Sequence, residues 1–286
     1  MENLYKRIGL LNSLDSDQKI KIPKGVTQIR IDVGLSDTAP NTLFWLNNQK
    51  KCFVIGIEPL SEHWDELSKL NFGDRFLGIK AAISNTEKPS RRTFYHLENS
   101  GASSLLEPTS EETYADGQSW KIKKEVVVDT ISLQFVLDHI PWERFDYIEH
   151  IKTDCEGHDF EVVKSIGKYT EMVAAISSEF SYNNLNTYKG VTLELYQEFM
   201  DYLRLNNFLP DPIHAQWCAC EFDEPLGGFN SCTRFKALRS YLTFPFRVDG
   251  PDERLHCFWV NQELKYLNKK FIEDFSELLD NTTVGE

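Results

Sequence analysis

The sequence predicts an α/β protein with a mostly parallel central sheet and helices on both faces. Two observations lead to this prediction. Two β-branched or apolar runs, residues 28–33 and 52–57, each bring a carboxylate to their end and are each followed by a helix-like segment. A later run leads into Asp154-Cys155-Glu156-Gly157-His158, which places two carboxylates and an imidazole where a strand gives way to a helix. Because open α/β sheets bind ligands at the carboxyl ends of their strands, these ends predict a binding site.

The first two strands have the order of a nucleotide-binding unit. The first strand contains Asp32 and ends at Gly34, and a helix-like segment follows from about residue 41. The second strand is apolar enough to be buried on both faces, and Glu58 comes directly after it. An acid at roughly this distance from the first turn meets a ribose diol in dinucleotide-binding folds. Such folds also need Gly-x-Gly-x-x-Gly, and only Gly34 is present here.

The remaining elements follow from hydrophobic periodicity, apolar runs and turn residues. Residues 1–25 are expected to form an N-terminal lead-in with a short helix at 2–11, and residues 26–286 a single domain. Further strands are expected at 76–84, 92–96, 121–129, 145–153, 172–180, 217–222 and 255–260. Further helices are expected at 132–140, from 160, at 193–205 and at 264–279.

Six motifs, in this order along the chain, resemble those of the FkbM-type S-adenosylmethionine-dependent methyltransferases. They are Asp32-Val33-Gly34, Gly56-Ile57-Glu58-Pro59, Ala81-Ala82-Ile83-Ser84, Gly101-Ala102-Ser103-Ser104-Leu105, Val128-Asp129-Thr130-Ile131-Ser132-Leu133 and Ile151-Lys152-Thr153-Asp154-Cys155-Glu156-Gly157-His158. The resemblance implies a Rossmann-like methyltransferase fold, S-adenosylmethionine as cofactor, and O-methylation of a small molecule or a glycan. The first loop departs from the family pattern, because Leu35-Ser36-Asp37-Thr38 stands where Ala-Asn-x-Gly is usual.

The expected cofactor-binding residues follow the parts of the cofactor. We expect Glu58 on the ribose diol, since a carboxylate accepts two hydroxyl hydrogen bonds at once. Asp32 and Gly34 are expected to shape the first turn and hold the amino-acid head group, with Ser36 as a direct or water-mediated partner. The resemblance also implies that Ala82 and Ser84, after the third strand, contact the adenine.

The expected catalytic residues are Asp154, His158 and Glu179. Asp154 is expected to face the cofactor, and His158 or Glu179 to take the acceptor proton, because general bases of this kind contribute roughly 10²–10⁴-fold to a rate. A histidine at a helix start can also serve only as a structural cap, so that alternative stays open for His158.

Two other functions share this pattern. A nicotinamide-dependent oxidoreductase would use the same acidic strand ends. This chain, however, lacks the glycines that such an enzyme requires. A non-catalytic cofactor-binding relative would keep Asp32 and Glu58 without chemistry. No metal is predicted, because the cysteines and histidines after residue 213 lack the spacing of a zinc site, although Asp154, Glu156 and Glu179 could supply oxygen ligands.

Composition excludes some partners. The chain has 31 basic and 44 acidic residues and a formal charge of −13, so nucleic acid is not expected as a partner. No window reads as a signal peptide or a membrane helix, and six irregularly spaced cysteines favour reduced thiols, so a cytoplasmic location is expected. The identity of the acceptor and the oligomeric state do not follow from the sequence.

Overall fold

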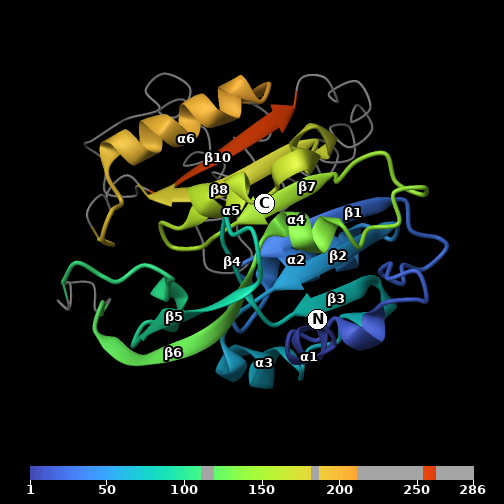
Figure 1. Ribbon diagram of the computed structural model, residues 1–286, viewed down its shortest axis with the longest axis horizontal. Helices are drawn as coiled ribbons and strands as arrows, with labels where there is room; N and C mark the ends of the chain where they lie inside the picture. Colours follow the sequence, from blue (N-terminus) through green and yellow to red (C-terminus); the bar gives the residue numbers. More distant parts are fainter. Residues whose placement is uncertain (111–118, 182–186, 211–253, 262–286) are drawn as a thin grey trace, which may run out of the picture.

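A seven-stranded sheet organises the chain (Figure 1). The computed structural model describes residues 1–110, 119–181, 187–210 and 254–261. In sheet order the strands are β3 (Phe76–Ile79), β2 (Cys52–Ile57), β1 (Gln28–Val33), β7 (His150–Thr153), β8 (Ala175–Ser181), β10 (Arg254–Asn261) and β9 (Phe208–Pro210). The first five run parallel, and β10 is antiparallel to both of its neighbours. The expected α/β fold with a mostly parallel sheet is therefore confirmed.

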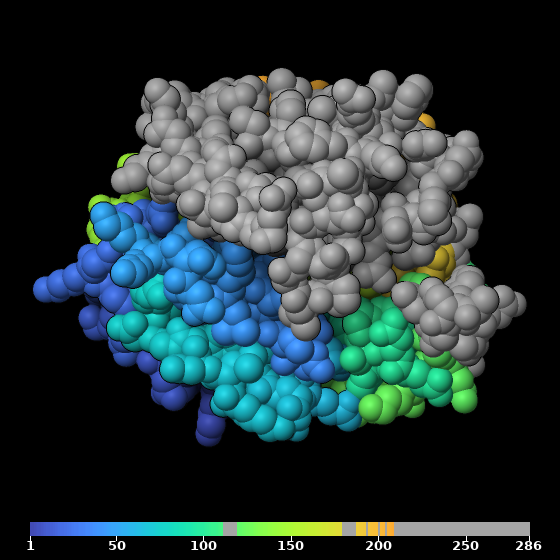
Figure 2. Space-filling view, turned by 180° about the vertical axis from the view of Figure 1, so that it is seen from behind, coloured from blue at the N-terminus to red at the C-terminus, as the bar shows by residue number. Residues whose placement is uncertain are grey.

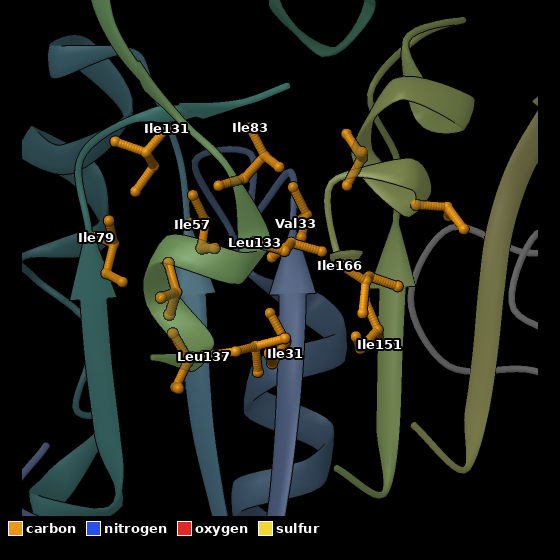
Figure 3. Packing of buried hydrophobic residues seen from close by; sticks show 14 of the residues in the cluster. Ile31, Val33, Ile57, Ile79, Ile83, Ile131, Leu133, Leu137, Ile151 and Ile166 are labelled. Atoms are coloured by element: carbon orange, nitrogen blue, oxygen red, sulfur yellow. The ribbon is translucent and has the colours of Figure 1, made fainter. Parts of the chain in front are cut away.

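Helices cover both faces of this sheet, which explains why β2 and β7 are buried along their whole length and β1 at every residue but its first. The described helices are α1 (Glu2–Arg7), α2 (Pro40–Asn48), α3 (Ser61–Leu67), α4 (Leu133–Leu137), α5 (Asp159–Lys164) and α6 (Leu193–Leu205). On one face, Leu133 and Leu137 of α4 pack beside Ile31 and Val33 of β1 (Figure 3). On the other, Trp45 of α2 packs in a separate buried cluster with residues of β2.

Short 3₁₀ turns complete the connections between these elements. They are η1 (Leu11–Ser13), η2 (Gly73–Arg75), η3 (Ser100–Ala102) and η4 (Gly167–Met172). At the start of α4, the Ser132 hydroxyl accepts a hydrogen bond from the Phe135 amide at 3.1 Å, a side-chain cap that fixes where the helix begins. None of the described helices is long and apolar enough to cross a membrane.

A second sheet of three strands projects from the first (Figure 1). It consists of β4 (Ala82–Ile83), β6 (Ile122–Ile131) and β5 (Ser90–Leu97), with β5 and β6 antiparallel. Seen from behind, the green surface of this hairpin adjoins the blue and cyan surface of the N-terminal segments (Figure 2).

The expectation of one strand over 76–84 was wrong. The chain leaves the main sheet after Ile79, where the Lys80 amide donates to the carbonyl of Ile8, and β4 then pairs with β6. An apolar run shows that a segment is buried but not with which partner it pairs, so the break was invisible in the sequence. The strand expected at 145–153 is also shorter, because within 145–149 only Ile148 forms a bridge, with Val173.

Residues 1–25 pack against the main core. Leu4, Ile8, Leu10 and Ile20 are buried in the same cluster as β1 and β2. The helix expected at 193–205 has those bounds. The strand expected at 217–222 and the helix expected at 264–279 lie outside the described residues.

Candidate functional site

The carboxyl ends of β1, β2 and β7 border one cavity. It holds about 600 Å³ of empty space, part of it open to solvent. The opposite wall comes from β5 and the η3 segment. The lining residues are Val33, Gly34, Ser36, Ile57, Glu58, Pro59, Leu60, His63, Ala81, Ala82, Ile83, Phe94, Ser100, Gly101, Ser103, Leu105, Asp154, Cys155 and His158. Six of the residues predicted for the site therefore meet here: Gly34, Ser36, Glu58, Ala82, Asp154 and His158.

Gly34 is required by the approach of two strand ends. It has φ of +87°, and a Cβ built on it would lie 2.0 Å from the carbonyl oxygen of Asp154. The Asp154 amide in turn donates to the carbonyl of Val33 at 3.0 Å. Only glycine fits this backbone conformation and this contact, so the first loop and the Asp154 loop touch directly.

Glu58 is buried at the cavity wall, with 4% of its surface exposed. Its Oε1 accepts from the Leu60 amide at 2.9 Å, and its Oε2 accepts from the Ser36 amide at 3.2 Å. Ser36, with φ of +57°, thus contacts Glu58 through its backbone, while its hydroxyl donates to Asp37 at 3.2 Å. Each oxygen of the Glu58 carboxylate is therefore held by a backbone amide.

Asp32 lies beneath the cavity and is not among its lining residues. It accepts from the Thr42 hydroxyl at 2.7 Å, and the Lys152 ammonium lies 3.4 Å away. Burial raises the pKa of Asp32, and the charge of Lys152 and the Thr42 hydrogen bond oppose that shift. Lys152 also donates to the carbonyl of Gly34 at 3.1 Å and to Asp154 at 3.2 Å.

Sequence reasoning assigned no role to Lys152. The available signal was a lysine near the end of a short strand, two residues before an acid. Such a position puts the ammonium on the same side of the strand as that acid. The buried lysine links the ends of β1 and β7 under the cavity floor, while the Asp154 side chain remains 27% exposed.

His158 is buried and held by Ser84. Its Nε2 lies 3.0 Å from the Ser84 hydroxyl, which also accepts from Arg92 at 2.9 Å. Burial, followed by the charges of Arg92 and Lys164, lowers the pKa of His158 to about 3, so the ring is neutral at physiological pH. Ser84 does not line the cavity and lies behind His158 instead.

The pairing register of β7 and β8 places Glu179 at the same edge of the sheet as Asp154. Thr153 pairs with Ser178 across β7 and β8, so Glu179 is the next residue on β8, level with Asp154. The side chain of Glu179 is outside the described part of the structure.

Asp159 is a further buried acid, at the start of α5, to which sequence reasoning assigned no role. It accepts from the Thr153 hydroxyl at 2.7 Å and from the Cys155 amide at 3.3 Å. Burial raises the pKa of Asp159 to about 7, and the charge of Asp154 adds to that shift.

Ser104, between the lining residues Ser103 and Leu105, contacts the loop that contains Asp154. The Ser104 hydroxyl lies 3.0 Å from the Glu156 carbonyl and 3.3 Å from that of Cys155. The Glu156 carboxylate accepts from Tyr188 at 3.2 Å and is not among the lining residues. Within the described segments, no group of three or more His, Cys, Asp or Glu is arranged to hold a metal ion.

A comparison with protein families decides the assignment. Residues 32–210, well over half of the chain, match the model of the methyltransferase FkbM domain. The chain belongs to the FkbM methyltransferase family. This FkbM protein is accordingly an S-adenosylmethionine-dependent methyltransferase, and S-adenosylmethionine is its cofactor.

Several solved methyltransferase structures are distantly similar to this FkbM protein. The plantazolicin methyltransferase BpumL, in complex with a desmethyl analogue and SAH, has a TM-score of 0.36 and 8% identity over 82% of this chain and 76% of its own. A Haemonchus contortus phosphoethanolamine N-methyltransferase 2 has a TM-score of 0.32 and 11% identity over 90% of this chain and 50% of its own. An antibiotic-related methyltransferase has a TM-score of 0.27 and 11% identity over 82% of this chain and 88% of its own.

These structural likenesses are too slight to support any argument about the present chain. No curated protein matches its sequence. The assignment therefore rests on the family match and on the residues of the cavity.

Proposed function

We propose that this protein transfers the methyl group of S-adenosylmethionine to a hydroxyl oxygen of a small molecule or a glycan. The observation that carries the proposal is that Gly34, Glu58, Asp154 and His158, from three strand ends, border one cavity. This arrangement brings a carboxylate suited to a ribose, a close-packed glycine loop, a partly exposed acid and a neutral imidazole into one space.

The cavity suits the cofactor in three respects. The Glu58 carboxylate is the natural partner of the ribose diol, since hydrogen bonds to a charged group are worth about 1.5–3 kcal/mol each. The Gly34 loop gives the amino-acid head group access to backbone groups, with Asp154 nearby to face positive charge. Ala82 belongs to an apolar cluster with Leu60 and Phe94, which is suited to the adenine.

The transfer is an in-line displacement. The acceptor oxygen forms a bond to the methyl carbon while the carbon–sulfur bond breaks, and the electron pair of that bond returns to sulfur. The enzyme therefore has to align oxygen and carbon and exclude water, and such positioning can supply about 7–11 kcal/mol of the barrier in the best cases. The acceptor hydroxyl must also lose its proton.

We assign His158 as the base that takes the proton of the acceptor hydroxyl, with Glu179 as the alternative base. If Nε2 of His158 donates to the Ser84 hydroxyl, its Nδ1 carries the lone pair that a base needs. A ring with a pKa of about 3 is a weak base in the resting enzyme. It is still adequate late in the step, because an oxygen that has gained a methyl group is far more acidic than an alcohol. Ser84 would then act on the site through His158.

The first experiment measures binding of S-adenosylhomocysteine to wild-type protein and to Glu58→Ala by calorimetry. The variant should bind about 10- to 100-fold more weakly, the worth of hydrogen bonds to a charged group. NAD serves as the control ligand and should not bind. Unchanged affinity in Glu58→Ala would remove Glu58 from the ribose site.

The second experiment separates an enzyme from a non-catalytic binder. Purified protein is incubated with S-adenosylmethionine labelled in the methyl group and a panel of sugars, polyols and phenols, with amines as a comparison. Label on an oxygen supports the proposal, and label only on nitrogen would overturn O-methylation. Binding of S-adenosylhomocysteine without transfer to any acceptor, under conditions where a known methyltransferase turns over, would favour the non-catalytic alternative.

A further inference from the structure

His63 lies at the cavity wall next to Glu58, and neither the family motifs nor sequence reasoning assigns it a role. It is on the first turns of α3, five residues after Glu58, and only 6% of its surface is exposed. Its Nδ1 lies 3.1 Å from Oε1 of Glu58, an ion-pair distance, although neither ring nitrogen has a well-aligned hydrogen-bond partner among the described residues. The ring therefore borders both the cavity and the carboxylate proposed for the ribose.

The two oxygens of Glu58 differ in how fully the protein occupies them. Oε1 has two nitrogen neighbours, the Leu60 amide at 2.9 Å and Nδ1 of His63 at 3.1 Å. Among the described residues, Oε2 has one such neighbour, the Ser36 amide at 3.2 Å. A carboxylate oxygen has about two lone-pair directions. Oε1 thus faces two protein nitrogens, and Oε2, with one, keeps more capacity for a ligand.

The electrostatics of His63 agree with this contact. Burial lowers its pKa, but the hydrogen bond and charge of Glu58, together with the charges of Asp37 and Glu62, more than offset burial and leave the pKa raised. Behind His63, the ring of His96 packs edge-on with centroids 6.3 Å apart, and Nδ1 of His96 lies 3.2 Å from Glu62. His96 does not line the cavity.

We propose that His63 is a positioning residue for the cofactor: its Nδ1, 3.1 Å from Oε1 of Glu58, pairs with that oxygen and so directs Oε2 toward the ribose diol. The inference rests on the proposed role of Glu58. A carboxylate held on one oxygen loses less side-chain freedom when the ligand binds, so less of the binding free energy is lost in ordering it. His63 does not itself need to touch the cofactor.

Three His63 variants separate this role from general packing. In His63→Asn the amide nitrogen stands near the place of Nδ1, and in His63→Gln it stands near the place of Nε2, while His63→Leu has no donor. We expect S-adenosylhomocysteine to bind His63→Asn within about threefold of wild type, and His63→Leu and His63→Gln about tenfold more weakly, the loss of one hydrogen bond to a charged group. His96→Leu, the matched control, should bind like wild type.

A second ligand tests whether His63 acts through the diol. The 2′-deoxy analogue of S-adenosylhomocysteine lacks one of the two hydroxyls, so His63→Leu should lose clearly less affinity for it than for the parent compound. A general defect in the cavity would weaken both ligands equally. In addition, His63→Leu should add little to the loss already caused by Glu58→Gln, because residues in one interaction are not additive.

The outcomes distinguish the two proposals. If wild-type protein does not bind S-adenosylhomocysteine, the proposed ribose site fails as a whole. If wild type binds and His63→Leu, shown by circular dichroism to be folded, binds equally well, the role of His63 is overturned and Glu58 stands alone. If His63→Leu does not fold, the comparison of His63→Asn with His63→Gln decides, and equal affinities would overturn the inference.

Discussion

The backbones of Gly34 and Asp154 are in such close contact that a methyl group on residue 34 would lie 2.0 Å from the Asp154 carbonyl oxygen. The ends of β1 and β7 are thereby joined at the cavity floor. The contact has a direct experimental consequence.

Gly34→Ala should destabilise the protein and abolish measurable cofactor binding, because the Cβ forces the two loops apart at a backbone position with positive φ. Overpacking and backbone strain each cost roughly 1–3 kcal/mol. Chemical denaturation and calorimetry measure the two effects. Gly25→Ala is the matched control, since a Cβ there meets nothing within 4 Å. A Gly34→Ala protein as stable as Gly25→Ala would show that the loops separate without cost.

Lys152→Met should lower the free energy of unfolding by about 3 kcal/mol, because removing one partner of a buried ion pair leaves the other charge uncompensated. Only 1% of the surface of Asp32 is exposed, so water cannot take the place of the ammonium there. The double variant Lys152→Met/Asp32→Asn should recover part of the loss. Absence of any recovery would indicate that Lys152 stabilises the fold through its contact with the Gly34 carbonyl instead.

His158→Gln should keep the affinity for S-adenosylhomocysteine but slow single-turnover methyl transfer roughly 10²-fold, because proton removal acts in the transition state. His139→Gln is a suitable control, since Nδ1 of His139 contacts the carbonyl of Gln18 and the ring does not line the cavity. A normal single-turnover rate in His158→Gln would transfer the role of base to Glu179.

The wild-type rate should also be independent of His158 protonation across the usual pH range. The pKa of His158 is lowered to about 3, so its base form is complete above about pH 5 and is lost only as pH falls toward 3. A pH–rate profile with a limb near 6.5, absent from His158→Gln, would contradict this and indicate an imidazole with its ordinary pKa of about 6.5.

Asp159→Asn should make the protein relatively more stable as pH rises. The folded pKa of Asp159 is about 7, well above the unfolded value of about 3.9, so the folded protein binds more protons between these values and loses stability as pH increases. Thermal unfolding of variant and wild type between pH 5 and 8 should therefore show a difference that shifts toward the variant by about 2–3 kcal/mol. A difference independent of pH would show that Asp159 is already ionised at pH 5.

The sequence by itself determined the elements whose signals are local. The apolar runs of β1 and β2 and the periodicity of α6 depend on which side of each segment is buried, and that can be read from neighbouring residues. The family motifs and the acids at strand ends likewise identified Gly34, Glu58 and Asp154 as residues of one sheet edge, because parallel strands end together.

Only the tertiary structure decided which of these side chains meet. Ser84 contacts His158 across 74 positions of sequence, and Lys152 lies between Asp32 and Asp154 under the cavity instead of within it. Hydrogen bonds and ion pairs of this kind depend on distances between segments that approach one another only when the sheet is assembled. No local periodicity encodes those distances, so the partners of the buried polar groups appear only in the fold.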